Sequence, residues 1–345
     1  MRALLSFIVG TTSFGSSLLA GVAGAAEPFN RGSQVDDPIH TPAELVESMR
    51  SAFGYNHCRP VHAKGIIFEG EFNPDSHARK ITKAPHLQGP SSKVTVRFSD
   101  FSGVPTIPDN DPMASPRGMA IRFELPGGTS TDLVAHSFNG FPVSNPDDLR
   151  ELMLAIAASG PCAAPPTALD RFLEFHQTAR AFLAAQKTPA SFATISYYEV
   201  DSFKFINAKG KGHYVRYQLV PEAGEQLLTD EEREKQSANY LMDEIKARVA
   251  AAPIGFALFA QVAERGDRIN DPSIAWPDNR KRVFLGRLEI KKLTANTAEE
   301  DRALVFNPSN VPMGIETADI MSIFYSKAFR LSAEEERDVA PVAGN

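Results

Sequence analysis

Arg59 and His62 lie three residues apart in the segment Arg59-Pro-Val-His-Ala-Lys-Gly65. An imidazole exchanges protons near neutral pH, and a guanidinium binds carboxylates. Because alternate side chains of an extended segment point to opposite faces, His62 is expected to face a cavity while Arg59 reaches round its edge to an anionic group. The pair predicts acid–base chemistry on a charged ligand; the alternative is a histidine with a purely structural role.

Short strands separated by tight turns are predicted to carry these residues. Apolar and polar residues alternate within them, and Gly or Pro lies between them, which is typical of an antiparallel barrel. The expected strands lie at about 62–72, 93–99, 118–124, 132–136, within 191–220, and at 254–263 and 282–290.

A helical region is predicted beside the barrel. Thr41 and Glu44 form a capping-box pattern with Pro42 at the first helical position, so a helix is expected from there to about Phe53. Apolar residues recur at helical spacing in further segments, at about 147–158, 167–186, 240–251 and 319–330. Without a repeat or a clear linker, the chain is expected to form one α+β domain over residues 26–345.

The composition of the chain is that of an ordinary globular protein. Of its 345 residues, 43% are hydrophobic and 23% are charged, which suffices for a sizeable core. The formal net charge of -6 leaves no basic footprint for nucleic acid as a partner. The 23 phenylalanines predict mainly core packing, with an aromatic-lined ligand pocket as the alternative.

Residues 1–25 are typical of a secretory signal peptide. Arg2 supplies a positive charge, apolar residues follow, and Ala23-Gly24-Ala25 has the small residues of a cleavage site. Polar residues within this segment argue against a permanent membrane helix, and no later segment is long and apolar enough to span a bilayer. The mature protein is therefore expected to be soluble and secreted, or periplasmic in a Gram-negative bacterium.

The chain contains two cysteines, Cys58 and Cys162. An oxidising compartment permits one disulfide between them, which would brace the segment that begins at Arg59. The alternative is a pair of buried free thiols. Because no CxxC or CxxCH motif is present, structural zinc and covalently attached haem are not expected.

Seven short motifs occur in a fixed order along roughly residues 37–332. They are Arg59-Pro-Val-His-Ala-Lys-Gly65, Val96-Arg-Phe-Ser99, Ser115-Pro-Arg-Gly-Met-Ala-Ile-Arg-Phe123, Phe138-Asn-Gly-Phe-Pro-Val143, Phe203-Lys-Phe-Ile-Asn-Ala-Lys-Gly210, Ile274-Ala-Trp-Pro277 and Phe306-Asn-Pro-Ser-Asn-Val-Pro-Met-Gly-Ile-Glu316. This series resembles the catalase superfamily, and most closely its shorter branch, the catalase-related peroxidases.

The resemblance implies an antiparallel β-barrel with a helical region, a buried haem b and peroxide chemistry. His62 falls on the family's distal histidine, the acid/base that moves a proton between the peroxide oxygens. Ser99 falls on the serine that orients that imidazole. Arg59 and Arg97 fall on arginines that meet the haem propionates. Phe141 falls in the segment that lines the distal pocket.

The distal site departs from the large catalases at one position. His136 occupies the place of their distal asparagine, within Leu133-Val-Ala-His-Ser137. A histidine can still form a hydrogen bond to a peroxide, but it can also titrate or approach the iron. The alternative is that it fills space and bonds to a neighbour.

The proximal side admits two alignments. The family's last helix carries an arginine and, four residues later, the tyrosine whose phenolate binds iron. Anchoring on Gly314-Ile-Glu316 places Tyr325 at the arginine and Phe329 at the tyrosine. Anchoring on Tyr325-Ser-Lys-Ala-Phe-Arg330 places Tyr325 at the ligand and Met321 at the arginine. Both alignments lack the arginine, and the second predicts Tyr325 as the metal ligand.

Two functions follow from these residues. The first is an exported haem-dependent peroxidase that reduces hydrogen peroxide or organic peroxides with small electron donors, with His62 as acid/base. The second is a protein of the same fold whose proximal ligation is altered or lost, and which binds haem or an apolar ligand without peroxide turnover. The retained distal residues favour the first, and the missing arginine favours the second.

Overall fold

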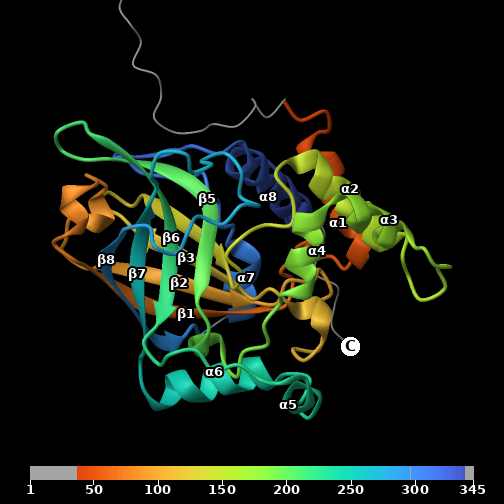
Figure 1. The fold of residues 1–345 in the computed structure, drawn as a ribbon. Helices are drawn as coiled ribbons and strands as arrows, with labels where there is room; N and C mark the ends of the chain where they lie inside the picture. Colours follow the sequence, from red (N-terminus) through yellow and green to blue (C-terminus); the bar gives the residue numbers. More distant parts are fainter. Residues whose placement is uncertain (1–36, 296, 339–345) are drawn as a thin grey trace, which may run out of the picture.

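Eight antiparallel strands close into a barrel in the computed structural model of the protein, which describes residues 37–295 and 297–338 (Figure 1). The strands lie in the order β4-β3-β2-β1-β8-β7-β6-β5, and pairing between β4 and β5 closes the barrel. A ninth short strand, β9, extends the sheet at β5. Their bounds are β1 Gly65–Pro74, β2 Ser92–Ser99, β3 Gly118–Glu124, β4 Ser130–His136, β5 Tyr197–Ile206, β6 Gly212–Pro221, β7 Ile254–Val262, β8 Arg282–Leu293 and β9 Ile315–Thr317. The predicted α+β fold with an antiparallel barrel is confirmed, whereas the predicted signal peptide at 1–25 lies outside the described residues.

Aromatic side chains fill the main core of the barrel. Phe98 stacks on Phe192 with ring centroids 5.3 Å apart and also contacts Tyr197 at 6.0 Å. Offset and edge contacts of this kind add to the large apolar area that each ring buries. The fully buried aromatic residues include Phe68, Phe72, Phe98, Phe123, Phe192, Tyr197, Phe203, Phe205 and Phe256. Many of the phenylalanines therefore serve the core, as the composition predicts.

The helices gather mainly on one side of the barrel. Figure 1 shows α1 to α4 together with α8 on that side, and α6 with α5 below the barrel. Their bounds are α1 Pro42–Phe53, α2 Pro146–Ala157, α3 Ala168–Phe175, α4 Gln177–Ala184, α5 Asp230–Glu234, α6 Tyr240–Ala251, α7 Thr297–Ala303 and α8 Ile320–Asp338. None of the helices in the described part of the chain is both long and apolar enough to cross a bilayer.

A second apolar cluster holds α1, α2 and α8 together. The helix α1 begins with the predicted capping box, in which the side chain of Thr41 accepts a hydrogen bond from the backbone of Glu44. The buried faces of the three helices then meet, since apolar residues recur every three or four positions. The cluster includes Leu45, Met49, Leu149, Leu152, Met321, Phe324 and Tyr325. This packing fixes the position of α8 beside the barrel.

Three expectations about element boundaries were wrong. The strand expected from His62 begins at Gly65, because His62 has a left-handed backbone conformation with φ 55°. The helix expected over 167–186 is two helices, which meet at His176 with φ −117° and ψ 79°. Residues 191–196, expected within a strand region, precede β5 and include a short helical turn at Phe192–Thr194.

Candidate functional site

Two adjoining cavities bring all seven predicted site residues together. The larger, of about 570 Å³, is lined by His62, His136, Phe141 and Tyr325 among others. The smaller, of about 100 Å³, is lined by Arg59, His62, Arg97 and Ser99 among others. They adjoin because they share lining residues, namely Val61, His62, Val134, Ala135 and Phe329. The larger volume is that of an ordinary small-molecule or cofactor site.

His62 and Arg59 reach the same cavity, which corrects the expectation that they face opposite ways. The left-handed conformation of His62 turns the chain just before β1. Hydrogen bonds from the backbone N–H of His62 to the carbonyl of Phe101, at 2.7 Å, and from Ala63 to Ser102, at 3.0 Å, hold that turn. A non-glycine residue adopts such a backbone at a cost, and such strain concentrates at functional sites.

A row of paired residues across three strands forms the floor beneath His62. Ser99 on β2 pairs with Gly118 on β3, which pairs with His136 on β4. A Cβ atom added at Gly118 would lie 2.4 Å from Oγ of Ser99 and 2.8 Å from Nδ1 of His62. The imidazole therefore lies over Gly118, because only glycine leaves room for it there. Neighbouring strands lie about 4.8 Å apart, so His136 is one strand away from this point.

Ser99 contacts the inner nitrogen of the His62 ring. Nδ1 of His62 lies 3.0 Å from Oγ of Ser99, and the ring makes an edge contact with Phe101 at 5.6 Å. Burial, together with the positive charge of Arg97, lowers the pKa of His62 to about 3. The imidazole is thus neutral over the physiological range. With Nδ1 occupied, Nε2 is the nitrogen available to a molecule in the cavity.

Asp301 joins the two arginines of the smaller cavity, and sequence reasoning did not find it. Its carboxylate accepts from Nε and Nη2 of Arg97, at 2.5 and 3.0 Å, and pairs with Nη1 of Arg59 at 3.0 Å. Burial alone would raise the pKa of Asp301, but the two guanidinium groups, that of Arg97 above all, hold it below its usual value. Asp301 lies on α7, more than two hundred residues from both partners, so no local pattern signals it.

His136 lies at the end of β4 with one ring nitrogen paired and the other unpaired. The backbone N–H of Phe138 donates to Nδ1 at 3.3 Å, whereas the buried Nε2 has no partner in the described part of the chain. The ring contacts Phe141 at 6.0 Å and Phe182 at 6.3 Å. Burial lowers the pKa of His136 to about 4, so this imidazole is also neutral near pH 7.

Tyr325 and Phe329 both line the larger cavity, one helical turn apart on α8. Their rings stack with centroids 5.7 Å apart, and Tyr325 also contacts Phe141 at 5.8 Å. The two alignments of this helix thus place either residue at the cavity, but Tyr325 is the only tyrosine among its described lining residues. Its hydroxyl is buried without a hydrogen-bond partner in the described structure. Lys327 and Arg330 are exposed, as expected from the helical spacing.

Three buried acids near Tyr325 form a feature that the sequence did not reveal. They are Glu199, Asp201 and Asp319, with exposed fractions of 3%, 7% and 1%. Burial raises the pKa of Tyr325 well above its usual value, and the charges of Asp201 and Asp319 raise it further. The charge of Arg216 acts on Asp201 and Asp319. Its side chain donates to the hydroxyl of Ser202 and to backbone carbonyls. The phenol of Tyr325 therefore keeps its proton until a cation replaces it.

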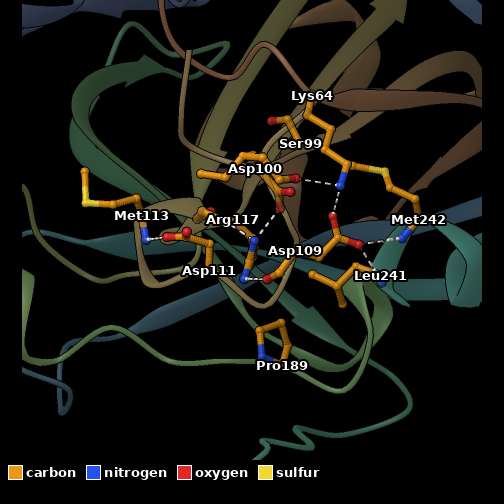
Figure 2. A network of polar contacts seen from close by, with 12 residues as sticks. Lys64, Ser99, Asp100, Asp109, Asp111, Met113, Arg117, Pro189, Leu241 and Met242 are labelled. Atoms are coloured by element: carbon orange, nitrogen blue, oxygen red, sulfur yellow. Dashed lines mark hydrogen bonds and ion pairs between the residues drawn. The ribbon is translucent and has the colours of Figure 1, made fainter. Parts of the chain in front are cut away.

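A buried polar network supports β2 from behind Ser99 (Figure 2). Asp109 accepts from Nζ of Lys64 at 2.5 Å and from the backbone N–H groups of Leu241 and Met242 at 2.8 and 3.2 Å. Arg117 pairs with Asp100, the residue that follows Ser99, and donates to the carbonyl of Asp109 at 2.6 Å. The network ties the loop before β1 and the end of β2 to the start of α6.

The cavity residues fit a haem group. The buried Tyr325 hydroxyl without a partner is a possible iron ligand, and tyrosine is one of the side chains that hold haem iron. Phe141 and Phe329 supply flat apolar walls, and Arg59 and Arg97 supply guanidinium groups at the adjoining cavity. The disulfide between Cys58 and Cys162 that was considered from the sequence is not formed in this structure, in which Cys162 is exposed.

Known proteins are similar to this chain in sequence and in fold. Residues 56–324 match the catalase family. A catalase-related peroxidase of Mycolicibacterium paratuberculosis (strain ATCC BAA-968 / K-10) is 32% identical over 307 residues, which cover 86% of this chain and 96% of that protein. Another, of Synechococcus elongatus (strain ATCC 33912 / PCC 7942 / FACHB-805), is 30% identical over 298 residues, which cover 85% of this chain and 87% of that protein.

Solved catalase structures are similar to the barrel and its helices. Catalase A from Saccharomyces cerevisiae gives a TM-score of 0.69 at 19% identity and covers 81% of this chain, but only 60% of its own length is matched. A bacterial catalase gives a TM-score of 0.69 at 20% identity and covers 98% of this chain and 67% of its own. The fold, the matched residues 56–324 and the two relatives lead to one conclusion: the chain belongs to the catalase family.

Proposed function

We propose that the protein is a haem-dependent peroxidase that reduces hydrogen peroxide or organic peroxides with electrons from small donors. The observation that carries this proposal is the pairing of His62 with Ser99 at one cavity that also holds the unpartnered hydroxyl of Tyr325. A base for the peroxide proton and a ligand atom for iron thus share one space. The names of the two catalase-related peroxidases support the same reaction class.

Three sets of residues would hold haem b in this site. Tyr325 would supply the ligand oxygen and Phe141 would pack against the ring system. Arg59 and Arg97, whose guanidinium groups bind Asp301 in this structure, would meet the propionates, which then compete with that carboxylate. Haem, when bound, supplies the redox-active iron for peroxide reduction. Because metal binding requires a deprotonated ligand, haem binding is expected to release the proton of Tyr325.

His62 would move the peroxide proton. Its neutral Nε2 accepts the proton of the peroxide O–H and then gives it to the departing oxygen, which is the role of a general acid–base group. For this role Nδ1 would carry the proton and donate it to Ser99 Oγ, so that the lone pair stays on Nε2. The overall reaction consumes a peroxide, two protons and two electrons from the donor, and it yields water with an alcohol or a second water.

One observation favours the alternative function. The acids Asp201 and Asp319 act on the phenol of Tyr325, at a place where a cation would favour the phenolate. Such surroundings suit altered or lost proximal ligation, in a protein that binds haem or an apolar ligand without peroxide turnover. The two functions share the cavity and differ in whether Tyr325 binds iron.

A haem titration separates the two functions. Haem is added to the wild-type protein, to Tyr325→Phe and to Tyr55→Phe. Tyr55 is half-exposed and does not line either cavity, so its variant serves as the control. The proposal predicts one haem per chain and a Soret band that changes in Tyr325→Phe but not in the control. Absence of stoichiometric binding rules out the peroxidase, and an unchanged band in Tyr325→Phe rules out this ligand.

We further propose that the protein is exported to the periplasm or secreted. Residues 1–25 support this, because they combine a basic start, an apolar stretch and the Ala23-Gly24-Ala25 cleavage pattern. Expression of the full chain in a Gram-negative host, followed by N-terminal sequencing of the periplasmic fraction, is expected to find a protein that starts at Ala26. A cytoplasmic protein that retains Met1 or Arg2 would contradict it.

A further inference from the structure

We infer that α7 is a strap over the two arginines of the smaller cavity, and that the carboxylate of Asp301 must leave them before a ligand carboxylate can bind. The strap therefore controls how tightly the site takes a porphyrin that carries propionate groups. This inference rests on the proposed function for the identity of the ligand. The attachment of α7 rests only on contacts within the chain, so it can be tested without iron and without turnover.

The guanidinium of Arg97 has a fixed position on the barrel wall. A Cβ atom added at Gly65 would lie 2.4 Å from its Cζ, so the group lies directly over this glycine. Nη2 of Arg97 donates to the carbonyl of Ala63 at 3.3 Å, and only 3% of the residue is exposed. Its Nε and Nη2 also donate as a fork to the two carboxylate oxygens of Asp301, at 2.5 and 3.0 Å. Because this edge holds one carboxylate as a fork, a propionate can bind there only in place of Asp301.

Arg59 contacts α7 through both of its terminal nitrogens. Nη1 lies 3.0 Å from Oδ1 of Asp301, and Nη2 donates to the carbonyls of Asp301 at 2.5 Å and of Leu304 at 2.6 Å. The last carbonyls of a helix have no partner within it, so Arg59 serves as their donor. The end of α7 thus presents a carboxylate and two carbonyls to the arginines, and these are acceptors that a ligand carboxylate would replace.

The sequence of α7 gives the helix little apolar attachment. The segment Thr297-Ala-Glu-Glu-Asp-Arg-Ala303 contains no large apolar residue, and Glu299 and Glu300 are exposed. A helix of seven residues is marginal by itself, because it gains few hydrogen bonds for the residues it orders. Segments with few buried apolar contacts open locally at a low cost in free energy. The contacts with the two arginines are therefore a main attachment of α7 to the barrel.

Both ends of the strap are tied to the barrel. The backbone N–H of Ile67 on β1 donates to Oγ1 of Thr297 at 3.1 Å, at the start of α7. Beyond the end of α7, Arg122 on β3 donates to the carbonyl of Val305, and its Cζ lies 5.3 Å from the ring centroid of Phe306. Release from the two arginines would thus lift the middle of a tethered segment. A ligand carboxylate would gain access to the arginines while the strap stays attached.

The balance of charge favours exchange over shared binding. Asp301 is ionised, because Arg97 and Arg59 hold its pKa below its usual value. The two guanidinium groups therefore exceed its charge by one and attract a further anion while α7 is in place. With two propionates bound, Asp301 would be a third carboxylate against two guanidinium groups, and like charges at this distance repel each other. We therefore expect the arriving carboxylates to displace Asp301.

The affinity test uses metal-free protoporphyrin IX, which carries both propionates but no iron, and its dimethyl ester, which lacks both charges. Absorbance titrations give the Kd of each porphyrin for the wild-type full chain, for Asp301→Asn and for Glu299→Gln. The last variant makes the same change at an exposed position of α7 and serves as the control. Because a charge-assisted contact no longer competes, Asp301→Asn is expected to bind protoporphyrin IX about 10- to 100-fold more tightly than the wild type. The control should bind it as the wild type does, and all three proteins should bind the ester equally.

The release of α7 is followed by amide hydrogen exchange of the wild-type chain, which needs no substitution. Peptides that cover residues 297–304 are expected to exchange faster when protoporphyrin IX is bound, because local opening exposes their amides. The ester should leave this exchange unchanged. Slower exchange with protoporphyrin IX, or equal affinities of the wild type and Asp301→Asn for it, would overturn the strap and leave the proposed function standing.

Two further outcomes separate the strap from the proposed function. Tighter binding in Asp301→Asn and faster exchange of α7, in a protein that shows no peroxide turnover when loaded with haem, would support the strap and contradict the peroxidase. Failure of all three proteins to bind either porphyrin would contradict both, since no carboxylate ligand of this kind would then reach the arginines.

Discussion

Nδ1 of His62 lies 3.0 Å from the hydroxyl oxygen of Ser99. The contact joins the turn before β1 to the end of β2, and it leaves Nε2 as the ring nitrogen that can serve a bound molecule. The serine is buried, with 4% of its surface exposed, so water does not replace it easily. The orientation of the imidazole thus depends on one hydroxyl group.

Replacing Ser99 by alanine tests this dependence. Because the ring loses its one side-chain hydrogen bond, we expect the rate of peroxide reduction to fall about tenfold, in line with one hydrogen bond of about 1 kcal/mol or somewhat more. The steady-state rate of the haem-loaded variant gives the measurement. The exposed Ser51→Ala serves as the control. A rate equal to that of the control would show that Ser99 does not orient His62.

A methyl group at Gly118 is expected to displace the His62 ring. The added carbon would lie 2.8 Å from Nδ1 and 2.4 Å from Oγ of Ser99, which is closer than such atoms approach. Gly118→Ala should therefore lower peroxide turnover more than Ser99→Ala does, with a loss of stability of about 1–3 kcal/mol from overpacking. Urea unfolding and turnover are measured together. Gly160→Ala, at an open position, is the matched control; an effect no larger than in this control would place the ring elsewhere.

Sequence patterns predicted the elements whose signals are local. The capping box at Thr41 and Glu44 marks the start of α1, and alternation marks β2, β3 and β4. The backbone conformation of His62 could not be predicted in this way, because contacts with Phe101 and Ser102, far along the chain, hold it. The break at His176 could not be predicted either, because neither Gly nor Pro stands there.

The ordered motifs identified the distal residues, but not the charges around them. Asp301 reaches Arg97 from α7, and the acids Asp201 and Asp319 meet near Tyr325 from separate elements. Sequence spacing gives no information about pairs that only the closed barrel brings together. The proximal alignment also stayed open, because Tyr325 and Phe329 lie on one helix face and both reach the cavity.

The burial of His86 leads us to expect that the folded protein is less stable in mild acid than at neutral pH. Burial lowers the pKa of His86 to about 3 from the usual 6.5, so between these values the unfolded chain binds a proton that the folded chain does not. Stability therefore falls as the pH falls through this window. From pH 7 to pH 5 the contribution is about 2 kcal/mol. Urea unfolding of wild type and His86→Leu at both pH values should show this difference, since the other histidines act equally in both proteins.

One result would contradict the lowered pKa of His86. A stability difference between wild type and His86→Leu that stays constant from pH 7 to pH 5 would mean that His86 titrates normally in the folded protein. Asp132 lines a third, separate cavity together with His86 and pairs with Arg122 at 2.8 Å, and both of these residues remain in the variant.

Removing Asp109 should destabilise the whole domain. The substitution Asp109→Ala leaves the ammonium of Lys64 without its carboxylate and two backbone N–H groups of α6 without their acceptor. Breaking a buried pair on one side costs about 3–5 kcal/mol. Asp111→Ala, which removes a single hydrogen bond to the backbone of Met113, is the control and should cost about 1 kcal/mol. Similar unfolding midpoints for the two variants would contradict this role.

The most direct test of the account compares hydrogen peroxide reduction by the haem-loaded wild type and by His62→Ala at equal haem content. The account predicts turnover in the wild type and a loss of about 10²–10⁴-fold in His62→Ala, which is the usual contribution of a general acid–base group. The Soret band, set from the Tyr325 side, should change little. An undiminished rate in His62→Ala would contradict the assignment of His62 as the acid/base.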